Sequence, residues 1–145
     1  NKLYELFPFT IDPCPVHAEQ DAMKTSWGEG MAFVNPPFKH SGAFLFRAIE
    51  LGIKAVFIVP SQTHYSYIRH ARQFIFGIIF LRKGLVFSGY KEAMPMPMSL
   101  YLVANKPVRE TRVAFWDPFD IKRKIPSCAE KKKPPFELIR NFNYF

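Results

Sequence analysis

The hydrophobic positions of this chain fall in short runs that end at prolines, glycines or polar residues. Residues 7–11, 31–34 and 54–59 are largely apolar runs, and a proline-containing loop follows each of them. Runs of this length and composition are typical of strands, and the near-continuous third run is typical of a parallel strand covered on both faces. Residues 74–80, 85–87 and 99–104 predict further strands, the first two joined by a hairpin-like turn.

Two helices are predicted between these strands. Ser41 is placed to cap a helix that ends at Gly52, and its apolar residues include Phe44, Leu45 and Ala48. Thr63 is placed to cap a second helix, over residues 64–73. Alternating strands and helices predict an α/β fold: a mostly parallel sheet with an antiparallel edge and with helices on its faces.

The pattern changes after Asn105. Residues 106–145 are rich in proline, lysine and aromatic residues and show no clear period. We therefore divide the chain into a domain of residues 1–105 and a basic C-terminal extension of residues 106–145. The extension is expected to wrap the domain or to reach a protein partner.

Composition narrows the classes of partner. The chain has 145 residues, a formal net charge of +8 and a pI near 9.6, which favours nucleic acid over an anionic membrane, although many basic proteins bind neither. Two isolated cysteines are too few for a disulfide framework or a zinc site, so a reduced, intracellular protein is expected. No apolar stretch approaches the roughly 20 residues of a membrane span, and no signal peptide is visible.

The chemistry-bearing residues gather where strands are predicted to end. Loops at residues 12–15, 35–38 and 60–63 follow three predicted strands, and ligands bind beyond the carboxyl ends of an open parallel sheet. Asp12 suits a ribose hydroxyl or an amine of a nucleoside cofactor. The Asn-Pro-Pro-Phe loop (residues 35–38) offers an amide oxygen, a fixed carbonyl and an aromatic face, which together suit a planar base with an exocyclic amine.

These motifs resemble the phage-type DNA N6-adenine methyltransferase family, the small Dam-like enzymes, in an Asn-Pro-Pro-Phe variant. Residues 9–14 are similar to the first-strand signature of that family, and Trp27 followed by residues 33–38 is similar to its tryptophan and catalytic loop. Residues 56–60 and 80–87 resemble its downstream segments. Phe38 replaces the commoner tyrosine, Pro15 replaces alanine, and the glycine-rich cofactor loop of larger methyltransferases is absent.

The resemblance implies an abbreviated Rossmann-like methyltransferase sheet and an enzyme that uses S-adenosylmethionine. The residues implied to bind this cofactor are Asp12, Pro13, Cys14 and Asn35. The residues implied to be catalytic are Asn35, Pro36, Pro37 and Phe38. In this scheme Asn35 Oδ1 and the Pro36 carbonyl accept the two N6 hydrogens of adenine, while the Phe38 ring stacks on the base.

Basic and aromatic residues near these loops are candidates for nucleic-acid contact, with solvated loops and turns as the alternative. They are Lys39, His40, His64, Tyr65, Arg82 and Lys83. DNA is favoured by the resemblance, and Phe38 keeps RNA open. The competing function is a catalytically degenerate methyltransferase-fold subunit with a structural or nucleic-acid-binding role, suggested by Pro15, the missing glycine-rich loop and the long extension.

Overall fold

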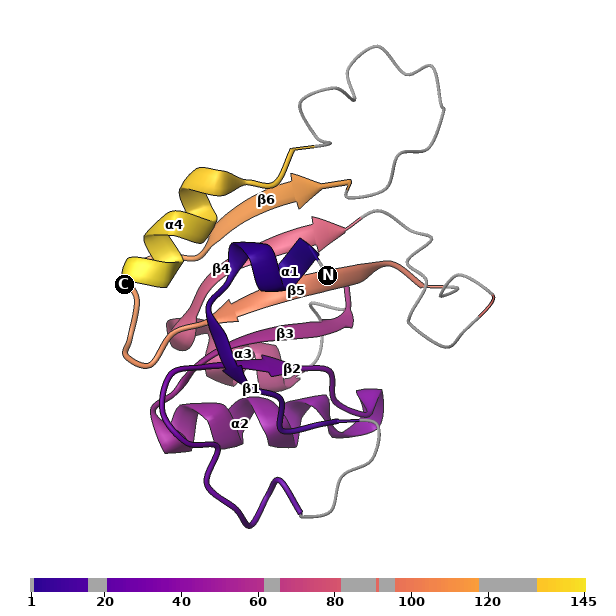
Figure 1. The fold of residues 1–145 in the computed structure, drawn as a ribbon, viewed down its shortest axis with the longest axis vertical. Coiled ribbons are helices and arrows are strands. Elements are labelled where there is room, and N and C mark those ends of the chain that lie inside the picture. Colours follow the sequence, from indigo (N-terminus) through magenta and orange to yellow (C-terminus); the bar gives the residue numbers. More distant parts are fainter. Residues whose placement is uncertain (1, 16–20, 62–65, 82–90, 92–95, 118–132) are drawn as a thin grey trace.

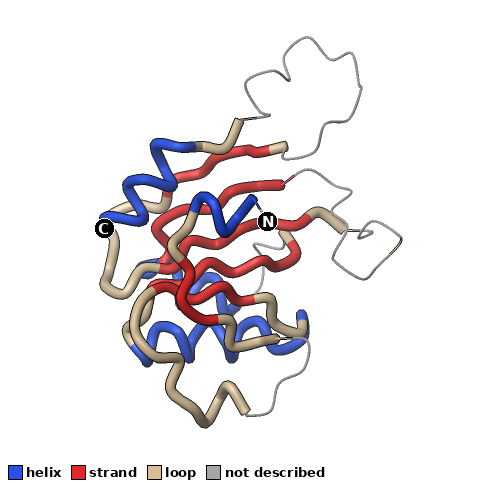
Figure 2. The backbone as a smooth tube through the Cα atoms, in the orientation of Figure 1, coloured by secondary structure: helices blue, strands red, loops and turns tan. Residues whose placement is uncertain are grey.

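The computed structural model describes residues 2–15, 21–61, 66–81, 91, 96–117 and 133–145, and they form one six-stranded sheet in the order β1-β2-β3-β5-β4-β6 (Figures 1 and 2). The strands are β1 (Phe9–Ile11), β2 (Met31–Val34), β3 (Lys54–Pro60), β4 (Ile75–Leu81), β5 (Met98–Val103) and β6 (Arg112–Trp116). Strand β5 is antiparallel to both of its neighbours, whereas the other pairs are parallel. The predicted α/β class and mostly parallel sheet are confirmed.

Helices cover both faces of this sheet (Figure 1). They are α1 (Lys2–Leu6), the 3-10 helix η1 (Phe38–His40), α2 (Ser41–Leu51), α3 (Ser66–Ala71), the 3-10 helix η2 (Arg72–Phe74) and α4 (Phe136–Tyr144). One buried cluster lies between the sheet and α2 with α3, and a second lies between the sheet and α4 with α1. Of the helices in the described ranges, none has the length and apolar character needed to cross a membrane.

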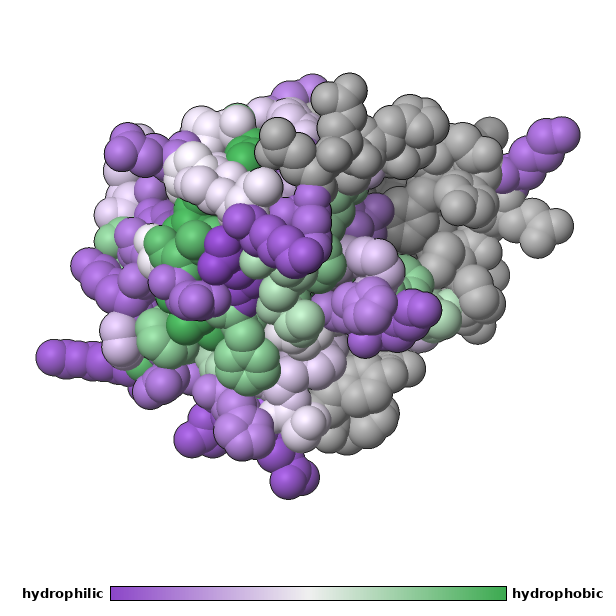
Figure 3. Space-filling view, turned by 90° about the horizontal axis from the view of Figure 1, so that it is seen from below, coloured by the Kyte–Doolittle hydropathy of each residue, from purple (hydrophilic) through white to green (hydrophobic). Residues whose placement is uncertain are grey.

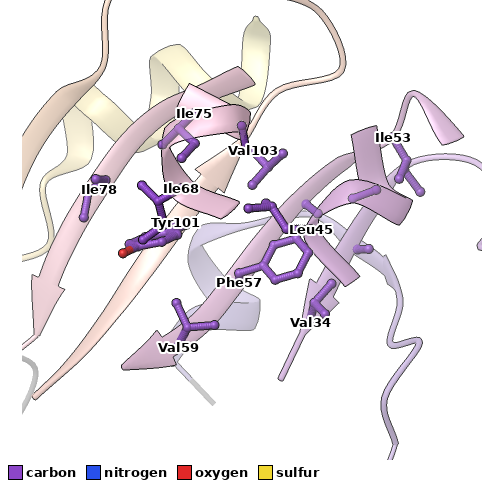
Figure 4. Packing of buried hydrophobic residues seen from close by; sticks show 14 of the residues in the cluster. Val34, Leu45, Ile53, Phe57, Val59, Ile68, Ile75, Ile78, Tyr101 and Val103 are labelled. Carbon is purple, nitrogen blue, oxygen red and sulfur yellow. The ribbon is translucent and has the colours of Figure 1, made fainter. Parts of the chain in front are cut away.

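Strand β3 supplies side chains to both clusters because successive residues of a strand point to opposite faces. Phe57 belongs to the cluster under α2, whereas Val56 and Ile58 belong to the cluster under α4. Figure 4 shows the Phe57 ring beside Leu45 of α2, with Val34 of β2 nearby. Full burial of such a side chain stabilises the fold by roughly 1.5–3 kcal/mol. Seen from below the view of Figure 1, the surface carries apolar areas among hydrophilic side chains (Figure 3).

Helix α2 has the predicted bounds, but its start differs in detail. It ends at Gly52, whose left-handed φ of 63° lets the following amide bond back to the Ala48 carbonyl. Ser41 was predicted to be the N-cap and is instead the first helical residue. The 3-10 helix η1 leads directly into α2, so both the Ser41 amide and its hydroxyl donate to the Phe38 carbonyl.

The antiparallel strand lies inside the sheet rather than at its edge, which corrects the prediction. Strand β5 pairs with β3 on one side and β4 on the other, and all six of its residues are buried. Apart from Ser99 its residues are largely apolar, which suits this position because both neighbouring strands and both helical layers cover it. The outermost strands of the sheet are β1 and β6.

The C-terminal extension contains regular structure that the sequence pattern did not indicate. Strand β6 pairs with β4, and α4 buries Leu138, Ile139 and Phe142 against the sheet. Lys54 Nζ donates to the Phe142 and Asn143 carbonyls at 2.6 and 2.9 Å, which satisfies the last turn of α4. Helix α1 was also not predicted. The predicted turn and strand at residues 82–87, and the start of the helix predicted at residue 64, lie outside the described residues.

The connection from β1 to β2 closes on a tight contact between Thr10 and Gly30. Thr10 Oγ1 donates to the Glu29 carbonyl at 2.8 Å, and Gly30 has a φ of +109°. A Cβ on Gly30 would overlap the Thr10 side chain. Gly28, two residues earlier, also has a positive φ, of 75°, but a Cβ there would meet no atom within 4 Å.

We predict that Gly30→Ala destabilises the fold far more than Gly28→Ala. The left-handed backbone alone costs Gly28→Ala about 1–2 kcal/mol. Gly30→Ala adds the clash with Thr10, for a loss of roughly 3 kcal/mol or more in the free energy of unfolding. Urea denaturation of both variants measures the difference. Equal losses would show that the Thr10 contact does not constrain this connection.

Candidate active site

The strand order brings the three predicted loops to one edge of the sheet, the one formed by the carboxyl ends of β1, β2 and β3. Strands β1, β2 and β3 are adjacent and parallel, with Ile11 beside Ala32 and Val34 beside Phe57. Asp12 therefore follows the end of β1 next to the strand that leads into Asn35. By this register Asn35 stands two residues farther along, an offset of about 6.6 Å.

Asp12 is half-buried at this edge. Its Oδ1 accepts the Cys14 N–H at 2.9 Å, which forms a tight turn across Pro13. Burial raises the pKa of Asp12 and outweighs this hydrogen bond, which acts in the opposite direction. Within the described ranges the second carboxylate oxygen has no hydrogen-bond partner. One oxygen is thus used by the turn, and the other remains available to a donor.

Cys14 is not a nucleophile in this arrangement. Burial, and secondarily the Asp12 carboxylate, raise the pKa of its thiol to about 12. The thiol is therefore neutral near pH 7, and thiolate chemistry is suppressed. The side chain packs against the buried cluster under α2, so it supports the turn that presents Asp12.

The Asn-Pro-Pro-Phe loop has fixed backbone and free acceptors. Pro37 adopts φ −53° and ψ 128°, and its carbonyl accepts the His40 N–H at 2.8 Å. Among described residues, neither the half-buried Asn35 amide nor the Pro36 carbonyl takes part in a hydrogen bond. The Phe38 ring is half-buried and packs against the cluster under α4. The loop thus offers two acceptors beside a partly exposed ring that the core holds in place.

Trp27 is a core residue. It is 1% exposed, its Nε1 donates to the Ala22 carbonyl at 2.9 Å, and its ring stacks on Phe44 of α2 at 6.3 Å between ring centroids. Arg47 of α2 also donates to the Thr25 carbonyl at 3.1 Å. These contacts attach the β1–β2 connection to α2, the helix that begins beside the Asn-Pro-Pro-Phe loop.

The loop after β3 is held by β5. The Ser61 hydroxyl shares a hydrogen bond with the buried Ser99 hydroxyl, and either of the two can be the donor. The Ser61 amide donates to the Pro97 carbonyl at 2.9 Å. Sequence reasoning missed Ser99, because a serine within an apolar strand gives no sign of its partner. Ser61 therefore fastens the third loop to the neighbouring strand.

The predicted nucleic-acid residues fall into two groups. Lys39 and His40 are exposed and directly follow the Asn-Pro-Pro-Phe loop. The other four lie outside the described residues: His64, Tyr65, Arg82 and Lys83.

No family model and no curated protein matches the chain. One similar solved structure is that of a predicted O-methyltransferase from Agrobacterium tumefaciens, at 16% sequence identity and a TM-score of 0.40. The alignment covers 78% of this chain and 51% of that chain, so this chain spans about half the length of that protein. A likeness this distant assigns no activity, and the function has to be argued from the residues at the sheet edge.

We predict that Asp12→Asn stabilises the folded protein near neutral pH. Because the pKa of Asp12 in the folded protein lies above its ordinary value of 3.8, the charged carboxylate weakens the fold as the pH rises from that value through the folded pKa. Asparagine removes this charge, and its Oδ1 can still accept the Cys14 N–H. Since solvent screens a half-exposed group, the expected gain in unfolding free energy is about 0.5 kcal/mol.

Asp21→Asn is the matched control. Asp21 is exposed, and its Oδ1 accepts the Met23 N–H at 2.9 Å in the same kind of turn. Urea denaturation of both variants at pH 7 and at a pH below 3.8 tests the origin of the effect. The gain should be confined to Asp12→Asn and should vanish at low pH. A less stable Asp12→Asn protein at pH 7 would contradict a burial cost at this site.

Proposed function

We propose that this chain is an S-adenosylmethionine-dependent methyltransferase that acts on the N6 amine of adenine in nucleic acid, with DNA favoured over RNA. One observation carries the proposal: parallel pairing of β1 and β2 sets the Asp12 carboxylate and the Asn-Pro-Pro-Phe loop beside each other on one sheet edge. Both motifs keep acceptor oxygens without partners in the described structure. That pairing of acceptors suits a nucleoside cofactor next to an aromatic amine.

The residues at the end of β1 fit the cofactor by their chemistry. The uncommitted oxygen of Asp12 can accept from a ribose hydroxyl or an ammonium group, the donors that S-adenosylmethionine carries. The turn over Pro13 and Cys14 keeps that oxygen at the edge, and Asn35 closes the site on the β2 side. When bound, S-adenosylmethionine supplies an activated methyl group, so no protein nucleophile is needed.

The Asn-Pro-Pro-Phe loop supplies the groups that hold the base. Asn35 Oδ1 and the Pro36 carbonyl accept the two amine hydrogens, which orients the nitrogen lone pair. As positive charge develops on that nitrogen, both acceptors stabilise it more strongly than they stabilise the neutral amine. Phe38 stacks on the base, and because the core holds its ring, little ordering is needed when the base arrives.

The charge of the chain supports a polyanionic substrate. A formal net charge of +8 draws in nucleic acid through the phosphates, independently of sequence. An adenine in a duplex has to leave its stack to reach the sheet edge, at a cost of a few kcal/mol. An unpaired adenine avoids most of that cost.

We predict that Asn35→Ala lowers methyl transfer by roughly 100- to 1,000-fold, because one acceptor for the developing charge is lost. Transfer of a tritiated methyl group to adenine-containing DNA and RNA oligonucleotides measures the effect. Asn105→Ala, an exposed asparagine outside the site, is the control and should retain wild-type transfer. Equal incorporation by wild type and Asn35→Ala would refute the proposal.

Calorimetry with S-adenosylhomocysteine separates the proposal from the catalytically degenerate alternative. Binding by the wild-type protein is expected. If the wild-type protein binds none, with or without an oligonucleotide, the chain is a structural or nucleic-acid-binding subunit on a methyltransferase-like scaffold.

A further inference from the structure

One segment of this chain contains almost no acidic residues. Between Glu50 and Glu92 the sequence has no Asp or Glu and six Lys or Arg residues. Between Glu29 and Glu50 it has no acidic residue either. Residues 30–91 therefore contain a single carboxylate, Glu50, although they include the Asn-Pro-Pro-Phe loop, α2 and α3.

Helix α3 and the 3-10 helix η2 present the basic residues of this region to solvent. Ile68 and Ala71 are buried against the sheet, so the inner side of α3 is apolar. Arg69, His70 and Arg72 are exposed on the outer side. This arrangement leaves the basic groups of α3 and η2 away from the core.

Helix α3 lies against the first turn of α2, next to the Asn-Pro-Pro-Phe loop. A Cβ on Gly42 would lie 3.1 Å from the Tyr67 ring, so glycine permits this close approach of the two helices. Gly42 follows Lys39 and His40 by only a few residues. The exposed groups of η1, α3 and η2 thus form a basic strip that starts at the loop and runs along α3 toward the opposite ends of the strands, where β4 begins level with Ala55. The strip consists of Lys39, His40, Arg69, His70 and Arg72.

No described acidic residue neutralises this strip. Glu50, the one carboxylate of this region, pairs with Arg47 at 3.2 Å rather than with a residue of the strip. Some exposed cations elsewhere do have a carboxylate nearby: Lys24 with Asp21 at 3.9 Å and Arg112 with Glu110 at 3.5 Å. Within the described ranges Lys39, Arg69 and Arg72 form no ion pair. Uncompensated cations concentrated on one surface attract a polyanion more strongly than a net charge spread evenly.

We propose that the basic strip binds the sugar–phosphate backbone of the strand whose adenine enters the Asn-Pro-Pro-Phe loop. This inference rests on the proposed function, because the loop defines which base the strand must deliver. Lys39 and His40 engage phosphates next to the target nucleotide, and Arg69 and Arg72 engage phosphates farther along. Such contacts position the strand and carry no sequence information.

The double variant Arg69→Gln/Arg72→Gln tests the strip. Binding is measured by fluorescence anisotropy with a labelled single-stranded DNA of about 20 nucleotides, longer than the roughly 4–16 nucleotides covered by one single-strand-binding domain. The same sequence is tested as duplex DNA and as RNA. We expect roughly tenfold weaker binding, and a slope of log K against log salt that is shallower by about 1.4 for the single strand, or 0.7 per lost phosphate contact.

Lys24→Gln/Arg140→Gln is the matched control, because it removes the same charge from exposed residues outside the strip. Lys24 lies in the β1–β2 connection, and Arg140 lies in α4 on the other face of the sheet. It should retain most of the affinity and the wild-type slope. Urea denaturation of both variants confirms that each is folded. Unchanged binding by Arg69→Gln/Arg72→Gln, or an equal loss in the control, would overturn the strip as a backbone site.

S-adenosylhomocysteine binding and methyl transfer, measured on the same proteins, keep the two proposals apart. If wild type transfers methyl groups and Arg69→Gln/Arg72→Gln keeps the wild-type KM for the oligonucleotide, the strip is wrong and the enzyme stands. If wild type transfers none but the double variant loses oligonucleotide affinity, the strip stands and the enzymatic proposal is wrong. The affinity of the double variant is compared for single-stranded DNA, duplex DNA and RNA. The nucleic acid for which the affinity falls most is the one that the strip binds.

Discussion

The candidate site depends on the direct parallel pairing of β1 with β2. Parallel neighbours need a crossover connection, which is usually a helix. Residues 12–30 make this connection with turns and loops in their described part, and they attach to the body of the protein through Trp27. Gly30 then lets the chain pass against Thr10 before β2 begins. Without this compact return, Asp12 and Asn35 would not follow neighbouring strands.

The site combines groups whose hydrogen-bonding capacity is left unused with a backbone that is firmly held. Burial opposes the charged form of Asp12, and within the described chain the Asn35 amide finds no partner. Burial of Asp12 lowers the stability of the free protein, because the charged carboxylate loses part of its hydration. Turn hydrogen bonds at Cys14, His40 and Ser41 keep these groups in place. A ligand that donates to them meets acceptors that are already in position, which is the physical meaning of preorganisation here.

Local signals in the sequence predicted the parts of the fold that depend on neighbouring residues. The bounds of α2 follow from its apolar stripe and Gly52, and the ends of β2 and β3 follow from prolines. The place of β5 between β3 and β4 did not follow, because strand order depends on pairing between residues far apart in the chain. Helix α4 was missed because its buried face has only three residues, and its stability comes from Lys54 and the sheet rather than from helical propensity.

The candidate site was likewise predictable only where it depends on local sequence. Its motifs and their order were visible in the sequence, whereas the partners that hold the loops in place, such as Ser99 for Ser61, were not. The basic side of α3 was missed for another reason. Arg69 and Arg72 fall in the helix predicted over residues 64–73, but the sequence alone does not show that Tyr67 packs on Gly42 and brings this helix to the loop.

Strand β3 links the extension to the core without bringing α4 to the candidate site. At its amino end, Lys54 donates to the last carbonyls of α4 and lies over the Phe142 ring at 5.3 Å from the centroid. At its carboxyl end, Pro60 leads into the loop fastened by Ser61. The C-terminal end of α4 is therefore fixed at the edge of the sheet opposite to Asp12 and Asn35. A helix in that position stabilises the sheet while leaving the acceptor groups of the other edge accessible, so the described structure of the extension is compatible with catalysis.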